Sequence, residues 1–160
     1  MNDKIIISFL LTAKKQTYAN AKMAKAPSTR QGSKDYEYNE TINGKRMTYH
    51  DTYFGKTKFI GEEVVYIDAD KPEWGMNYYG AALDESLTEE VVDGILRPAL
   101  MQVGIDKEVL PLRGPRHFEH DGYVYTFTVD GNISRFTGTE KIFKGGNLIY
   151  IGHCHGGTIN

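Results

Sequence analysis

Pairs of turn-forming residues divide this chain into short stretches of β-type sequence. Asn43-Gly44 and Asp121-Gly122 are each flanked by runs rich in Tyr, Thr, Val and Ile. Asn-Gly and Asp-Gly are the strongest short-range signals for a two-residue β-hairpin turn. Gly55, the segment 68–72 and Gly145-Gly146 mark three further turns. These turns predict antiparallel strands near residues 35–42, 46–54, 58–67, 73–81, 116–120, 123–130, 135–143 and 148–155.

Two strings of the sequence resemble each other at a fixed spacing. Phe59–Tyr66 reads Phe-x-Gly-x-Glu-x-Val-Tyr, and Phe136–Phe143 reads Phe-x-Gly-x-Glu-x-Ile-Phe, 77 residues later (136 minus 59). Self-similarity at a fixed spacing is the signature of a duplicated unit. The sequence therefore predicts an α+β fold, a tandem duplication of a helix followed by a four-stranded antiparallel meander, analogous to the cystatin-like folds. Residues 1–160 would form a single compact pseudo-twofold domain of two repeats, approximately 1–83 and 84–160.

Two stretches have the spacing of apolar side chains that is typical of an amphipathic helix. The first covers about residues 3–24, with an N-cap at Asn2 or Asp3. The second begins at the capping box Ser86-x-x-Glu89, and Pro98 is expected to kink or divide it. The inner face of the first helix would carry Ile6, Phe9, Leu10, Ala13, Thr17 and Ala21. A signal peptide is the alternative for this first stretch, but Asp3 and two interrupting lysines favour the helix and a cytoplasmic protein.

The composition excludes several classes of protein. Lys and Arg number 19 against 21 Asp and Glu, so the chain lacks the basic surplus of a nucleic-acid-binding surface. One cysteine excludes an internal disulfide and a zinc site built on several cysteines. The apolar runs are shorter than the roughly 20 residues of a membrane-spanning helix. We therefore expect no direct contact with nucleic acid, no membrane contact and, since no phosphate-binding glycine loop is present, no cofactor.

Alternation along the predicted strands places several polar side chains on the face that would pack against the helices. Asp51 belongs to the same alternating set as Tyr49 and Tyr53, and Glu140 to the same set as Ile142. A buried carboxylate is costly unless it is paired or bound, and residues that break the apolar pattern are often functional. The candidate ligand-binding residues are Asp51, Glu63, Asn77, Tyr79, Glu140, His153 and His155.

Two other interpretations of these residues remain open. Glu140, His153 and His155 would form a two-histidine, one-carboxylate metal set if they shared a face, although no further ligand spacing supports a metal site. Alternatively, the carboxylates Glu63 and Glu140 would each neutralise an arginine. The available partners are Arg30, Arg97 and Arg113.

Several strings resemble an uncharacterised bacterial family that is known only as a domain of unknown function. They are Tyr49–Gly55, Phe59–Tyr66, Trp74–Gly80, Leu110–Pro115 and His153–Gly157, and the resemblance covers nearly the whole chain. Members of that family are sometimes attached to repressor-type helix-turn-helix segments, which implies an effector-sensing or oligomerising module. The family assigns no catalytic residues.

The sequence thus favours a binding or sensing module for a small polar ligand or a partner protein. The alternative is a small enzyme that uses inward-facing carboxylates and histidines for acid–base or metal-assisted chemistry. A third interpretation is an interaction protein that forms a homodimer through its sheets.

Overall fold

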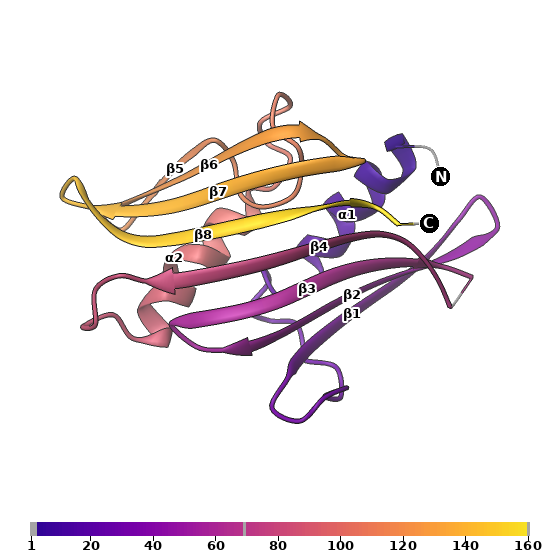
Figure 1. Cartoon of the computed structure of the whole chain (residues 1–160), viewed down its shortest axis with the longest axis horizontal. Helices are drawn as coiled ribbons and strands as arrows, with labels where there is room; N and C mark the ends of the chain where they lie inside the picture. The colour runs from indigo at the N-terminus through magenta and orange to yellow at the C-terminus, as the bar shows by residue number, and fades with distance from the viewer. Residues whose placement is uncertain (1–2, 69, 160) are drawn as a thin grey trace.

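Eight antiparallel strands form one continuous sheet, and both helices lie on the same face of it (Figure 1). The structure, a computed structural model, describes residues 3–68 and 70–159. The strand order across the sheet is β1-β2-β3-β4-β8-β7-β6-β5. In chain order the elements are α1 (Asp3–Lys15), β1 (Lys34–Ile42), β2 (Lys45–Gly55), β3 (Lys58–Ile67), β4 (Lys71–Ala82), α2 (Glu89–Met101), β5 (His117–His120), β6 (Tyr123–Asn132), β7 (Arg135–Lys144) and β8 (Asn147–Thr158).

The predicted strands are confirmed because the turn residues adopt the backbone that a tight hairpin needs. Asn43 and Gly44 have φ angles of 53° and 77°, and Asp121 and Gly122 have 49° and 76°. Positive φ at both central residues defines the type I′ turn, whose twist matches that of paired strands. Each of the eight predicted strands begins within two residues of the start of an observed strand and ends within three residues of its end.

The predicted fold class is wrong in its organisation. β4 and β8 pair from Trp74 opposite Thr158 to Ala82 opposite Tyr150, so the strands form one sheet instead of separate four-stranded meanders. Pairing of these two strands satisfies backbone groups that would otherwise remain open along two sheet edges. The helices also contact each other instead of each packing in a sheet of its own. The described residues therefore show neither an internal helix repeat nor the cystatin-like arrangement.

Both helices differ from their predicted bounds. α1 ends at Lys15, well before residue 24, and Ala21 is exposed. α2 takes its N-cap from Thr88 instead of Ser86, with the Thr88 hydroxyl accepting a hydrogen bond from the Val91 amide at 3.3 Å. Pro98 lies inside α2 without dividing it. Among the described residues, no helix is long and apolar enough to cross a bilayer.

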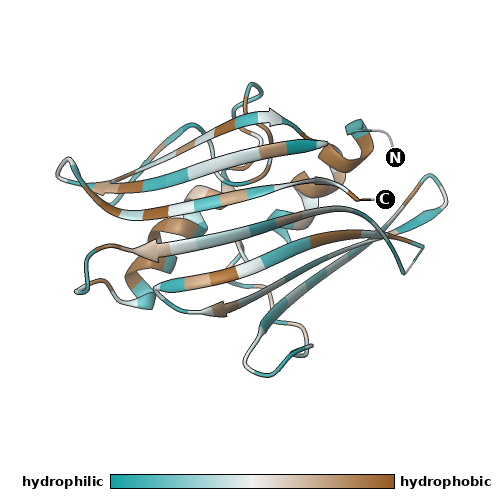
Figure 2. Ribbon diagram, in the orientation of Figure 1, coloured by the Kyte–Doolittle hydropathy of each residue, from teal (hydrophilic) through white to brown (hydrophobic). Residues whose placement is uncertain are grey.

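The core lies between the two helices and one face of the sheet, which we call the inner face. Phe9 and Leu10 of α1, Leu96 of α2 and Trp74 of β4 are completely buried there. Figure 2 shows hydrophobic residues concentrated on the helices and alternating with polar ones along the strands. Removal of this apolar surface from water is the main favourable contribution to folding.

Two β-bulges decide which side chains of β4 and β8 face the helices. The β3–β4 register shifts between Val65 and Tyr66, so that Glu73 is an extra residue of β4. The β7–β8 register shifts between Ile142 and Phe143, so that Ile149 is an extra residue of β8. One extra residue reverses the alternation of every side chain beyond it. The inner face therefore receives Met76, Tyr78, Tyr150 and Cys154, and the opposite, outer face receives their neighbours.

Candidate functional site

A cluster of buried charged and phenolic side chains lies on the inner face, beneath the helices. We call it the inner polar cluster. Its charged members come from α1, β2, β3, β7 and the segment before β5, and tyrosines from β2, β4, β6 and β8 complete it. The cluster consists of Lys14, Tyr49, Asp51, Glu63, Tyr78, Arg113, Tyr125, Glu140 and Tyr150.

Asp51 and Glu63 are direct cross-strand neighbours at the centre of this cluster. They pair in the β2–β3 register, and each is nearly inaccessible, with 4% and 3% of its surface exposed. Lys14 of α1 forms a buried ion pair with Glu63. Asp51 has no such ion pair among the described residues; the Tyr78 hydroxyl donates a hydrogen bond of 2.6 Å to Asp51 Oδ1. The two carboxylates therefore have unequal compensation.

This inequality raises the pKa of Asp51. Burial is the largest cause, followed by the negative charge of Glu63, and together they raise the pKa to about 7. The hydrogen bond from Tyr78 and the charges of Lys14 and Arg113 act in the opposite direction but do not outweigh them. Asp51 is thus a buried acid that changes its charge near neutral pH.

Glu140 is buried to the same extent but is fully compensated. Arg113 donates two hydrogen bonds to its carboxylate, at 2.8 Å and 3.1 Å. The Tyr150 and Tyr125 hydroxyls donate two more, at 2.8 Å and 2.9 Å. Burial alone would raise the pKa of Glu140, but the charge and hydrogen bonds of Arg113 outweigh it and hold the pKa below its usual value. The predicted pairing of Glu140 with an arginine is confirmed, whereas Glu63 pairs with a lysine.

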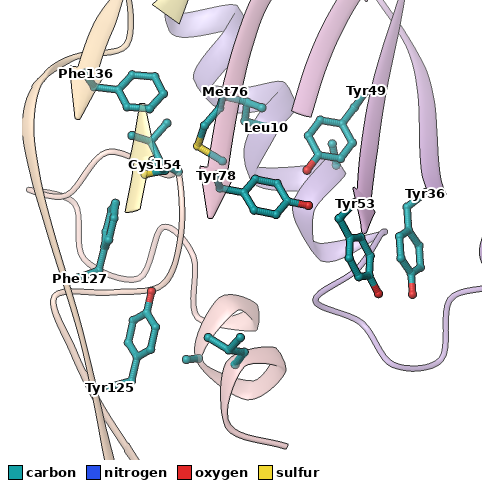
Figure 3. Packing of buried hydrophobic residues seen from close by; sticks show 14 of the residues in the cluster. Leu10, Tyr36, Tyr49, Tyr53, Met76, Tyr78, Tyr125, Phe127, Phe136 and Cys154 are labelled. Atoms are coloured by element: carbon teal, nitrogen blue, oxygen red, sulfur yellow. The ribbon is translucent and has the colours of Figure 1, made fainter. Parts of the chain in front are cut away.

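A cavity reaches the Asp51 side of the cluster, and we call it the inner cavity. Its free volume is about 30 Å³, the space of one or two water molecules. Asp51, Glu63 and Arg113 line its deep part, while exposed Lys56 and half-buried Glu89 also line it, so it opens to solvent at their end. Tyr49 and Tyr53 of β2 and Tyr78 of β4, which are labelled in Figure 3, also line this cavity. The remaining lining includes Lys14, Thr17, Tyr18, Phe59, Asp93, Leu100 and Leu112.

The structure divides the predicted site residues between the two faces of the sheet. Asp51, Glu63 and Glu140 lie on the inner face, as predicted. The predicted inward orientation of the other four is wrong, because the bulges in β4 and β8 reverse their alternation. They lie exposed along the outer face of the β4–β8 pair, in two cross-strand pairs: Asn77 with His155, and Tyr79 with His153.

These four residues line a shallow depression, which we call the outer groove. It has a volume of about 420 Å³ and is also lined by Ile60, Thr137 and Thr139. Because Glu140 lies on the other side of the sheet from His153 and His155, these three residues do not converge on one ion. Among residues 3–68 and 70–159, no group of three or more His, Cys, Asp or Glu side chains is arranged to hold a metal.

Sequence reasoning missed Lys14, Tyr78, Tyr125 and Tyr150 as members of the polar cluster. Lys14 did carry a signal, since it follows Leu10 by four residues and so interrupts the apolar stripe of its helix. Tyr78 carried none, because its orientation depends on the bulge at Glu73.

The fold and the cluster define a sheet-dominated protein with two helices over a cavity, and this cavity is lined by a buried carboxylate that has no ion pair within the described residues. The chain belongs to the family described as Domain of unknown function (DUF5680), whose model matches residues 51–159. This match includes Asp51, Glu63, Arg113 and Glu140, and it begins after α1 and β1. No curated protein and no solved structure gave a match.

Proposed function

We propose that this chain is a binding module for a small polar ligand, and that the ligand occupies the inner cavity beside Asp51. One observation carries the proposal. Asp51 is more than nine-tenths buried, and one of its oxygens has no donor within the described part of the chain. Every fully enclosed side-chain nitrogen or oxygen among the described residues has a hydrogen-bond partner. The unpartnered oxygen is therefore not fully enclosed and borders the cavity.

The energetics of Asp51 support a binding role over a purely structural one. A buried carboxylate without a cation destabilises the folded state, and a well-packed apolar residue there would cost less. Glu140 shows how this fold can compensate a buried carboxylate fully, with four hydrogen bonds donated to it. A ligand would supply the compensation that Asp51 lacks.

Sensing is the biological use that fits this proposal. Lys14 of α1 ion-pairs with Glu63, the direct neighbour of Asp51. Residues of both helices line the cavity, so its occupancy would act on the helices. We infer a bacterial, cytoplasmic effector-sensing role from the resemblance to proteins with helix-turn-helix segments. A homodimer formed through the sheets stays a prediction of the sequence.

A thermal-shift screen of small metabolites tests the binding function. A ligand at a hundred times its Kd adds about 2.7 kcal/mol to the free energy of unfolding. The expected result is a stabilising ligand whose effect is lost in Asp51→Asn and kept in His153→Ala, a change in the exposed outer groove. If the stabilisation by the ligand is lost in His153→Ala and kept in Asp51→Asn, the binding site lies on the outer face and the proposal is contradicted.

A second function, acid–base catalysis, has one observation in its favour. A general acid or base works best with a pKa near the working pH, and Asp51 has a pKa of about 7. In this version Asp51 would exchange a proton with a substrate atom at the unpartnered oxygen. Turnover that is abolished in Asp51→Asn while binding of the same compound persists would distinguish the enzyme from the binding module.

A further inference from the structure

We propose that the ligand of the inner cavity carries a primary or secondary ammonium group that donates a hydrogen bond to Asp51. This inference rests on the proposed binding function and specifies the chemical class of the ligand. It follows from the balance of charges and donors around the cavity.

Each neighbouring carboxylate on or beside the cavity already has a basic partner. Glu63 pairs with Lys14, Glu89 with Lys34 at 2.6 Å, and Asp93 with Arg97 at 3.2 Å. Glu140 pairs with Arg113 at 2.8 Å. Among the described residues, Asp51 has no ion pair, so its ionisation leaves one negative charge uncompensated. A cationic ligand would restore the balance, whereas an anionic ligand would add to the repulsion between Asp51 and Glu63.

The hydrogen-bond geometry requires a ligand that donates. Oδ1 of Asp51 accepts from the Tyr78 hydroxyl, and Oδ2 is the acceptor that remains. An ammonium group supplies a charge-assisted hydrogen bond to such an oxygen. A quaternary ammonium group carries the same charge but has no N–H to donate.

The aromatic rings around the cavity also disfavour a quaternary cation. Cages for such ligands use vacant ring faces. Here Arg113 lies over the Tyr78 ring at 5.3 Å, Lys14 over Tyr49 at 5.7 Å and Arg97 over Tyr18 at 4.2 Å. Since these three rings already face cations of the protein, they are poor partners for a second cation. The Asp51 carboxylate is then the group that would hold the charge of the ligand. The cavity volume of about 30 Å³ admits an ammonium group, and the rest of the ligand would extend toward Lys56 and Glu89 at the open end.

Binding of an amine should depend on pH through Asp51. The charged and titratable side chains around Asp51 come from several elements and are Glu63, Lys14, Arg113, Tyr78, Tyr49 and Tyr53. Only ionised Asp51 would bind the ammonium group, and the pKa of Asp51 is about 7 in the free protein. The affinity should therefore rise about tenfold between pH 6 and pH 8, with release of a proton on binding near pH 7.

The test is a protein NMR titration with four probes of similar size: propylamine, propyltrimethylammonium, 1-propanol and propionate. We expect saturable shifts at residues of the inner cavity with propylamine alone, at an affinity that rises about tenfold from pH 6 to pH 8. Asp51→Asn should weaken this binding at least tenfold. Asp35→Asn, a matched loss of a buried carboxylate that does not line the cavity, should leave the binding unchanged.

The outcomes separate this inference from the proposed function. Binding of 1-propanol, propionate or the quaternary probe in the cavity, equal to or tighter than that of propylamine, would overturn the ammonium inference and leave the binding module standing. Propylamine that binds there without a response to pH or to Asp51→Asn would also overturn it. Absence of binding by all four probes at the cavity would count against both.

Discussion

Replacement of Asp51 by Asn should stabilise the protein, and the gain should depend on pH. The ordinary pKa of this side chain is 3.8, and burial beside Glu63 raises it to about 7 in the folded state. A group with a raised pKa stabilises the fold below its unfolded pKa, and this contribution is lost as the pH rises through the folded pKa. The wild type therefore loses stability through Asp51 between about pH 4 and pH 7.

The magnitude follows from the size of the shift. One pKa unit corresponds to about 1.4 kcal/mol, so a rise from 3.8 to about 7 corresponds to at most about 4 kcal/mol. Asn has nearly the same shape and still accepts a hydrogen bond from Tyr78, but it carries no charge. The advantage of Asp51→Asn over the wild type should grow by up to about 4 kcal/mol from pH 4 to pH 8.

Urea denaturation at several pH values measures this difference, and an unchanged m value confirms that the unfolding transition is comparable. Asp35→Asn is the control of opposite sign. Burial would raise the pKa of Asp35, but hydrogen bonds from Ser33, Thr52 and Thr29 outweigh it and lower the pKa to about 2. That contribution, about 2 kcal/mol, is present above pH 4 and is lost as the pH falls toward 2, so Asp35→Asn should cost most at neutral pH. A difference between wild type and Asp51→Asn that stays constant from pH 4 to pH 8 would refute the reasoning.

Three further predictions follow from contacts in and near the cluster. Arg113→Met should lower the free energy of unfolding in urea by about 3–5 kcal/mol because it leaves Glu140 without its cation. The double variant Arg113→Met, Glu140→Met should recover most of that loss. If the losses of the two single variants simply add in the double variant, the pairing is contradicted. Cys154 should resist Ellman's reagent in the folded protein and react with it in urea, because the thiol is buried and burial raises its pKa to about 12. Rapid labelling of the folded protein would show that the thiol is not enclosed. Gly61→Ala should cost about 1–3 kcal/mol, since its methyl group would lie 2.5 Å from the Tyr78 ring, whereas Gly94→Ala in α2 meets no atom within 4 Å and should not destabilise.

Local chemistry explains why the strands could be predicted from the sequence. Hairpin turns depend on a few neighbouring residues, and Asn43-Gly44 and Asp121-Gly122 carry that information within two positions. The sheet as a whole depends on the pairing of β4 with β8, which are far apart in the chain. Nothing in either strand alone indicates that the two would pair, so the prediction of two four-stranded meanders was wrong.

The candidate site shows the same limit at the scale of one residue. Alternation correctly placed Asp51, Glu63 and Glu140 on the inner face. These residues lie on β2, β3 and β7, and the extra residues of the two bulges lie on β4 and β8. The bulges at Glu73 and Ile149 lie close to the turns that open β4 and β8, so they reverse nearly the whole of each strand. One extra residue in each strand thus moved all four candidates to the outer face.

Compensation, and not burial, distinguishes Asp51, the proposed ligand-binding carboxylate, from Glu140. Asp51 and Glu140 have the same exposure, 4%, and the same alternation pattern predicts both. Glu140 receives Arg113 from a loop 27 residues earlier in the chain, together with two phenols. Asp51 receives one phenol and faces a second carboxylate. The sequence pattern cannot make this distinction because the donors come from other elements. In three dimensions the distinction is clear, and it identifies Asp51 as the group whose charge a ligand would have to balance.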